Sequence, residues 1–114
     1  MYVMGMGIGI HAEHPDVGKV QGCQEPVACG VWFTSNGEPL PKMLKFKGED
    51  GEIYTLDHIQ IHSREKKYFC GILAVEYRCS TLWGGRTWVF RLLFYPEECR
   101  WNIIWETPVV SKNI

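Results

Sequence analysis

The sequence predicts a mainly β fold: a single small antiparallel sheet of about six strands, barrel-like or strongly curved, with meander topology. From residue 26 onward, short runs rich in Val, Ile, Phe, Tyr, Trp and Thr are separated by turn signals. A lasting helical period is hard to find. The 114 residues suffice for one domain. Six short strands must bury one face and protect two edges, which favours a curved or closed sheet.

Both ends of the chain are predicted to lie outside this sheet. Residues 1–22 contain five of the twelve glycines and keep neither a strand period nor a helix period, so we expect an irregular N-terminal arm. The β domain then spans residues 23–107, and residues 108–114 form a C-terminal tail. The opening "MYVMGMGIGI" lacks the positive start of a signal peptide and is shorter than the roughly 20 apolar residues of a membrane span. We therefore expect no membrane association.

The first two strands are separated by a clear turn signal. "ACGVWFTS" is rich in strand-forming residues, and "NGEPLP" ends it with Asn-Gly and two prolines, which are unsuited to a central strand. "KMLKFK" alternates apolar side chains with lysines, so one side of the second strand is apolar and the other faces water. "GEDGE" then predicts a hairpin turn at Asp50-Gly51.

The third strand, "IYTLDHIQIHSR", raises the question of a metal site. His58 and His62 are four residues apart, as in zinc-binding helices, but apolar and polar residues alternate here with the period of a strand. On a strand these two positions are about 13 Å apart, too far for one zinc ion. The apolar positions change parity near Asp57, which predicts a bulge or corner. We expect a bent strand without a metal.

Three further strands complete the predicted sheet. "REKKY" is interpreted as a charged connection, and "CGILAVEYRCSTLW" as the fourth strand. Gly84-Gly85 predicts a two-residue hairpin. "RTWVFRLLFY" carries bulky residues on both faces, which predicts a central strand, and "RWNIIWE" follows a proline-containing turn as the last strand.

The cysteines and histidines carry no recognisable catalytic or metal motif. The five cysteines lack C-x-x-C spacing, which is typical of reduced thiols in the cytoplasm, although Cys23 and Cys29 could bridge a turn in an oxidising compartment. A Cys2His2 site from these two thiols with His11 and His14 is a further alternative, but the spacing is unlike compact zinc motifs. We expect a cytoplasmic protein that holds no metal.

Other catalytic and cofactor motifs are equally absent from the sequence. "GMGIG" follows no strand and opens no helix, so it does not fit a dinucleotide-binding loop. The serines lie outside any G-x-S-x-G elbow. The sequence therefore predicts no enzyme and no cofactor.

Basic and aromatic residues predict an interaction surface instead. Its nine members are Trp32, Lys42, Lys45, Lys47, Arg64, Lys66, Lys67, Tyr68 and Trp83. Five tryptophans are more than a small core needs, and tryptophan is enriched at binding hot spots. The leading prediction is a protein partner, or a second copy of the chain that pairs through an open sheet edge. The alternative is single-stranded or duplex nucleic acid on a lysine and aromatic face.

Three blocks of sequence carry a resemblance to a known family. "GVWFTSNGEPLPKMLKF", "LDHIQIHSREKKYFCGI" and "FRLLFYPEECRW" resemble a family of short uncharacterised proteins in Gram-positive gut bacteria, often associated with mobile elements. The resemblance covers about residues 16–106, and "MYVMGMGIGIHAEH" departs from it. It implies a bacterial cytoplasmic setting and an accessory role in element maintenance or defence interference. It brings no known activity and no functional residues.

Overall fold

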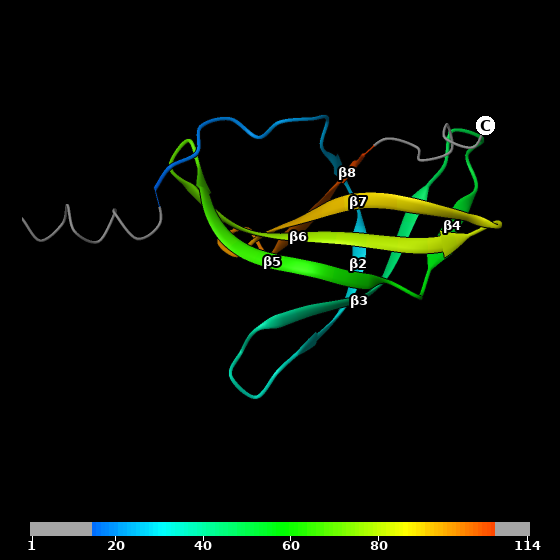
Figure 1. The fold of residues 1–114 in the computed structure, drawn as a ribbon, viewed down its shortest axis with the longest axis horizontal. Coiled ribbons are helices and arrows are strands. Elements are labelled where there is room, and N and C mark those ends of the chain that lie inside the picture. The colour runs from blue at the N-terminus through cyan, green and yellow to red at the C-terminus, as the bar shows by residue number, and fades with distance from the viewer. Residues whose placement is uncertain (1–14, 107–114) are drawn as a thin grey trace, which may run out of the picture.

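The computed structural model describes residues 15–106, which form eight strands in two antiparallel sheets (Figure 1). The strands are β1 (Glu25–Pro26), β2 (Ala28–Phe33), β3 (Pro39–Lys47), β4 (Ile53–Leu56), β5 (Gln60–Phe69), β6 (Ile72–Trp83), β7 (Arg86–Tyr95) and β8 (Arg100–Trp105). The larger sheet has the order β1-β8-β7-β6-β5, and the smaller has the order β2-β3-β4. Residues 15–106 contain no helix, and so none that is long and apolar enough to cross a membrane.

The antiparallel β character is confirmed, but the prediction of one sheet of about six strands is wrong. The chain begins in the larger sheet with β1, builds the whole smaller sheet, and returns to the larger sheet at β5. Both described sheets are open, so the barrel-like alternative is also wrong. Meander order holds for β2 to β4 and for β5 to β8, which are neighbours in chain order, but β1 departs from it because it pairs with β8. β7 is central as predicted.

The change from one sheet to the other occurs at residues 57–59. β4 ends at Leu56 and β5 begins at Gln60, so the predicted bent strand is two strands in different sheets. The corner at Asp57 is where the parity of the apolar residues changed in the sequence. Thr81 fixes this corner, since its hydroxyl donates a hydrogen bond of 2.7 Å to the His58 carbonyl. The corner therefore brings the apolar face of β4 against the larger sheet.

The tight turns follow from residues that accept positive φ angles. Gly51, Gly84 and Gly85 have φ of 86°, 62° and 78°, and the hairpins predicted there are present. A further two-residue turn joins β5 to β6 at Cys70-Gly71, with φ of 50° and 86°. The prediction of "REKKY" as a connection is wrong, because those residues continue β5 to this turn.

The two prolines predicted to interrupt the sheet lie inside β3. Pro39 and Pro41 pair with Phe33 and Val31 of β2, but β4 pairs with β3 only from Leu44 onward. The proline part of β3 therefore has a neighbour on one side alone. A residue without a backbone N–H is tolerated there, as it is at any sheet edge.

The main core lies between the two sheets. Leu44 and Leu56 of the smaller sheet are buried against the inner face of the larger sheet, where the buried side chains are Val75, Tyr77, Cys79, Phe90, Leu92, Phe94, Trp101 and Ile103. The Tyr77 hydroxyl donates a buried hydrogen bond of 2.5 Å to the Pro39 carbonyl, which links β6 to β3. Burial of these apolar faces is the main force that holds the sheets together.

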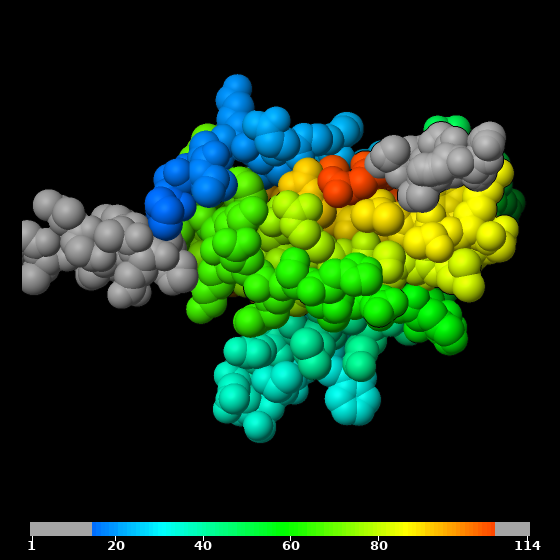
Figure 2. All heavy atoms as spheres, viewed as in Figure 1, coloured from blue at the N-terminus to red at the C-terminus, as the bar shows by residue number. Residues whose placement is uncertain are grey.

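The outer face of the larger sheet has a second, smaller core beneath residues 15–24. Val20 packs against a cluster of buried residues that includes Leu93 and Ile104. The Gln24 amide oxygen accepts hydrogen bonds from Tyr95 at 2.6 Å and from Asn102 at 2.9 Å. Figure 2 shows this segment in blue along one side of the molecule. The described part of the predicted arm is irregular but docked, while residues 1–14 and the predicted tail lie outside the described residues.

Candidate functional site

The lysines of the predicted surface do not form one stripe. Lys45 and Lys47 are exposed on the outer side of β3, whereas Leu44 and Phe46, which alternate with them, point to the inside. Lys42 lies at an irregularity of the β2–β3 pairing, beside a separate polar pocket. The smaller sheet therefore offers two lysines on a common face.

The basic residues of β5 are divided between the two faces of the larger sheet. Lys67 donates to Glu76 at 2.7 Å on the outer face. Arg64 is opposite Tyr77 in the strand pairing, so it lies on the other face, 3.6 Å from Glu38. Lys66 shares that second face, because positions two apart on a strand point the same way. The structure thus places Arg64 and Lys66 on one face of the larger sheet and Lys67 on the other.

The remaining predicted surface residues are aromatic, and each has its own surroundings. Tyr68 forms an isolated bridge with Asp16 near the end of β5. Trp32 is 70% exposed on β2, and Trp83 is 45% exposed at the end of β6. Figure 2 shows the β2–β3 hairpin in cyan, standing out from the rest of the molecule. Trp32 and Trp83 therefore belong to two separate candidate sites.

The histidines of β5 and its corner have different partners. His58 Nδ1 is 3.3 Å from Asp57, and His62 Nε2 is 2.7 Å from the Ser80 hydroxyl. Within residues 15–106, no group of three or more His, Cys, Asp or Glu side chains is placed to hold a metal ion. His11 and His14 of the alternative zinc site lie outside the described residues.

The cysteines form no disulfide among the described residues. Cys29 and Cys79 point into the main core, and burial raises the pKa of each thiol to about 12. Both thiols therefore stay protonated at neutral pH. A protonated thiol is a poor nucleophile and a poor metal ligand.

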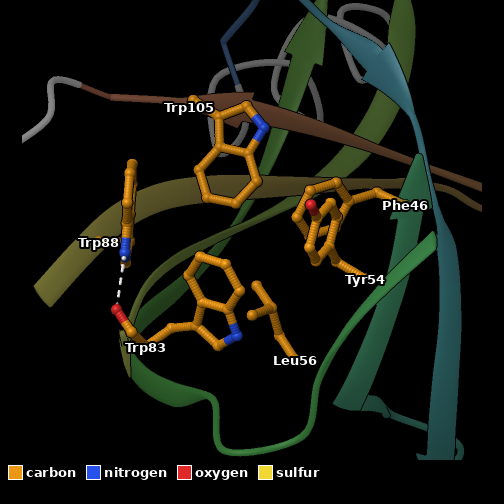
Figure 3. Close-up of a pocket in the computed structure, with 6 residues that line it drawn as sticks. All are labelled: Phe46, Tyr54, Leu56, Trp83, Trp88 and Trp105. Carbon is orange, nitrogen blue, oxygen red and sulfur yellow. Dashed lines mark hydrogen bonds between the residues drawn. The ribbon is translucent and has the colours of Figure 1, made fainter. Parts of the chain in front are cut away.

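A pocket that the sequence did not predict opens between the two sheets (Figure 3). We call it the aromatic pocket; it is lined by Phe46, Tyr54, Leu56, Trp83, Trp88 and Trp105. Three of these residues come from β3 and β4, and the three tryptophans come from β6, β7 and β8. Its volume is about 360 Å³. The site therefore exists only where the two sheets meet.

The five aromatic rings of the pocket form a closed circuit of contacts. Phe46 contacts Tyr54 at 5.8 Å between ring centroids, and Tyr54 contacts Trp83 at 5.6 Å. The circuit continues from Trp83 to Trp88 at 6.5 Å, from Trp88 to Trp105 at 6.2 Å, and from Trp105 back to Phe46 at 5.4 Å. Four of the five contacts have interplanar angles between 61° and 82°, in the favoured edge-to-face arrangement.

Hydrogen bonds at the rim hold two of these rings in place. The Tyr54 hydroxyl donates to Asp50 at 2.5 Å, and this bond lowers the pKa of Asp50 and raises the pKa of Tyr54. Trp88 Nε1 donates to the Trp83 carbonyl at 3.1 Å. None of the six lining residues is charged. The arrangement suits binding of an apolar group.

A second candidate site is the open edge of β2. The larger sheet ends at β1 and β5, and the smaller sheet ends at β2 and β4. β1 has two residues, β4 has four, and β5 carries four charged residues in succession, "REKK". β2, "ACGVWF", has six residues and no charge, with Trp32 and Phe33 exposed by 70% and 59%. Among the described strands, β2 is the long edge that has no charged residue.

In comparisons of the chain with family models, with curated proteins and with solved structures, no match was found.

Proposed function

We propose that this protein is a non-enzymatic binding module that acts by pairing the β2 edge with another polypeptide strand, and that the strand belongs to a second copy of the chain. The observation that supports it is the uncharged six-residue edge strand, in which Trp32 and Phe33 are exposed. The bacterial cytoplasmic setting and the mobile-element accessory role that the resemblance implies are part of this proposal.

The backbone of an edge strand supplies the binding energy. Half of its N–H and C=O groups point away from the sheet, where an added strand satisfies them. Natural sheets commonly protect long edges with charged residues, as β5 does, or keep them short, as β1 and β4 are. β2 uses neither protection. Its exposed Trp32 adds the large contact area that is typical of interface hot spots.

A second copy is the occupant that fits the charge of the chain. Two β2 edges that meet in an antiparallel pair form a symmetric contact, the commonest kind in homodimers. The strand itself carries no charge, and the formal net charge of the whole chain is −1, so electrostatic repulsion between copies is weak. The pair would join two three-stranded sheets into one continuous sheet.

Light scattering across protein concentration tests this proposal. We expect the wild-type protein to shift from monomer to dimer as concentration rises. Trp32→Lys places a charge on the edge and is expected to keep the protein monomeric. Ile53→Lys is the matched control, because Ile53 is 62% exposed on β4, the other edge of the same sheet, and this variant should still dimerise. A wild-type protein that is monomeric at every concentration refutes the proposal.

Nucleic-acid binding is the alternative function, and a salt titration distinguishes it from β2 pairing. The structure places Lys45 and Lys47 on one outer face but directs Arg64 and Lys67 to other faces, so the cationic area is small. Binding to labelled DNA or RNA that weakens steeply as salt rises would favour this alternative. Absence of binding at low salt would eliminate it.

A further inference from the structure

We infer that the aromatic pocket is a binding site for a neutral, planar aromatic molecule of one or two fused rings that carries a hydrogen-bond acceptor. This inference goes beyond the pairing of β2, and it does not depend on it. The pocket lies between β3 and β4 on one side and β6, β7 and β8 on the other, and none of its residues belongs to β2.

The size of the pocket sets the size of the ligand. A volume of about 360 Å³ falls at the lower end of the range for small-molecule sites, about 300 to 1,000 Å³. Such sites are mostly apolar and aromatic, with a few polar groups that orient the ligand. The aromatic pocket has this composition, since its six lining residues are five aromatic residues and Leu56.

The lining favours a neutral ligand over an ion. Phe46, Leu56 and the three tryptophans have no charge, and the Tyr54 hydroxyl is already bonded to Asp50. A charged ligand would lose its hydration without gaining an ionic partner, which is costly. Cation–π contacts alone would have to offset that loss for a quaternary ammonium. A neutral ligand does not incur this cost.

The arrangement of the rings favours an aromatic ligand over an aliphatic one. Figure 3 shows the Trp88 ring on one side of the cavity and the Phe46 and Tyr54 rings on the opposite side, with Trp105 and Trp83 between them. In four of the five contacts around the circuit the rings are steeply inclined to one another, so a guest ring meets both faces and edges. Aromatic pairs gain stabilisation from these geometries beyond the area that they bury.

One indole N–H group can supply a polar contact. Trp88 Nε1 donates to the Trp83 carbonyl, and Figure 3 shows the Trp105 nitrogen on the edge of the ring away from the cavity, which leaves the Nε1 donor of Trp83 for a ligand. Figure 3 shows the Trp83 nitrogen on the side of the ring that faces Leu56. Because Trp N–H is a donor only, the matching group on a ligand is an acceptor.

Coumarin is a suitable probe because it is neutral, has two fused rings and carries a carbonyl acceptor. We expect it to bind the full-length wild-type protein in a calorimetric titration, with a dissociation constant below about 1 mM. In the ¹H–¹⁵N spectrum of the same protein, the indole signals of Trp83, Trp88 and Trp105 should shift on binding, while that of Trp32 stays in place. Naphthalene, which lacks the acceptor, should bind about tenfold more weakly, and choline should not bind.

Two single-tryptophan variants locate the site. Trp83→Ala removes a ring that is 45% exposed and outside the main core, so the fold should persist by circular dichroism while affinity for coumarin falls at least about tenfold. Trp32→Ala removes an equally large ring from β2 and should leave the affinity unchanged.

Each of four results would overturn the inference. They are no coumarin binding to the wild-type protein, shifts confined to Trp32, equal loss in both variants, and choline binding at least as tight as coumarin. If naphthalene binds with the same affinity as coumarin, the ligand does not need a hydrogen-bond acceptor, and that part of the inference is wrong. The wild-type spectrum keeps the site testable even if Trp83→Ala does not fold. A monomeric wild-type protein would refute β2 pairing and leave this result untouched.

Discussion

Replacing Arg91 with methionine is expected to destabilise the protein strongly, because Arg91 is a charged residue in the middle of the central strand β7. Its side chain is 10% exposed and that of Glu76 is 2% exposed, and Arg91 Nη1 lies 2.9 Å from Glu76 Oε2. Arg91 also bonds Glu106 at 3.1 Å and the Gln21 carbonyl. One guanidinium therefore connects β6, β7, the end of β8 and the N-terminal segment.

The structure sets the size of the expected effect. Removal of one member of a buried ion pair costs about 3 to 5 kcal/mol, because the other charge is left buried. Glu76 keeps Lys67 at 2.7 Å, so the lower limit of about 3 kcal/mol applies to Arg91→Met. The double variant Glu76→Leu, Arg91→Met removes both buried charges and should lie within about 1 kcal/mol of the wild type.

The acid dependence of stability gives a second readout of the same contact. Burial alone would raise the pKa of Glu76, but hydrogen bonds from Lys67 and Arg91 outweigh it, and the pKa lies below the ordinary value of 4.5. A lowered pKa in the folded state stabilises the protein above pH 4.5, and this stabilisation is lost as pH falls through the folded value. The double variant has no Glu76 carboxyl, so its stability should not fall over this part of the acid pH range.

Urea unfolding followed by tryptophan fluorescence measures these free energies. Arg100→Met is the matched control, because Arg100 and its partner Glu98 are both more than half exposed, and an exposed pair contributes at most about 1 kcal/mol. A loss below about 1 kcal/mol for Arg91→Met would contradict the expected cost of leaving Glu76 buried without this partner. So would a double variant that is less stable than the single one.

Three further predictions concern the contacts that join the parts of the fold. Tyr77→Phe should lower the free energy of unfolding by about 1 to 3 kcal/mol, because the Pro39 carbonyl loses its donor; an equal loss for Tyr54→Phe at the surface would contradict this. Asp16 accepts hydrogen bonds from the amides of Gly18, Gly71 and Cys70, and these bonds lower the pKa of its carboxyl below 3.8. The contact therefore persists above pH 3.8 and is lost as the pH falls through the pKa of Asp16 in the folded protein. The amide shifts of Cys70 and Gly71 should titrate below pH 3.8, and Asp16→Asn should abolish that titration. Gly22→Ala should speed hydrogen exchange at the Val17 amide, because a Cβ there would lie 2.7 Å from Ile104 at a φ of +99°; Gly84→Ala, with open space around it, should leave that amide unchanged.

The strands were predictable from the sequence wherever one face is apolar. Alternation of apolar and polar residues located β6, β7 and β8, and Gly84-Gly85 located the turn between the first two. β5 was predicted only in part, because the four charges of "REKK" hide its pairing. Those charges are accommodated on an edge strand, where Lys67 reaches Glu76 on the next strand.

The turn at Cys70-Gly71 had no reliable signal in the sequence. Cysteine is an unusual residue for a φ of 50°, and the conformation is supported by Asp16, more than fifty residues away, which accepts from both turn amides. The burial of Glu76 has a similar origin. Alternation placed it opposite the apolar face of β6, and it is buried because residues 15–24 cover that outer face.

The aromatic pocket could not be predicted because it depends on how the two sheets meet. Tyr54 and Trp83 belong to different sheets, and the local pattern of either strand does not show their contact. The parity change at Asp57 was the available signal. It was interpreted as a bend within one sheet, whereas the chain changes sheets there. Nine surface residues were predicted, and of these only Trp83 lines the aromatic pocket.

β4 and β6 lie in different sheets, and aromatic residues of the two sheets meet around one pocket. The most direct test is a nuclear Overhauser experiment on the wild-type protein with the ring protons assigned. Cross-peaks are expected between Tyr54 and Trp83 and between Phe46 and Trp105, whose ring centroids are 5.6 Å and 5.4 Å apart. Absence of both cross-peaks in the folded protein would contradict this arrangement of the two sheets.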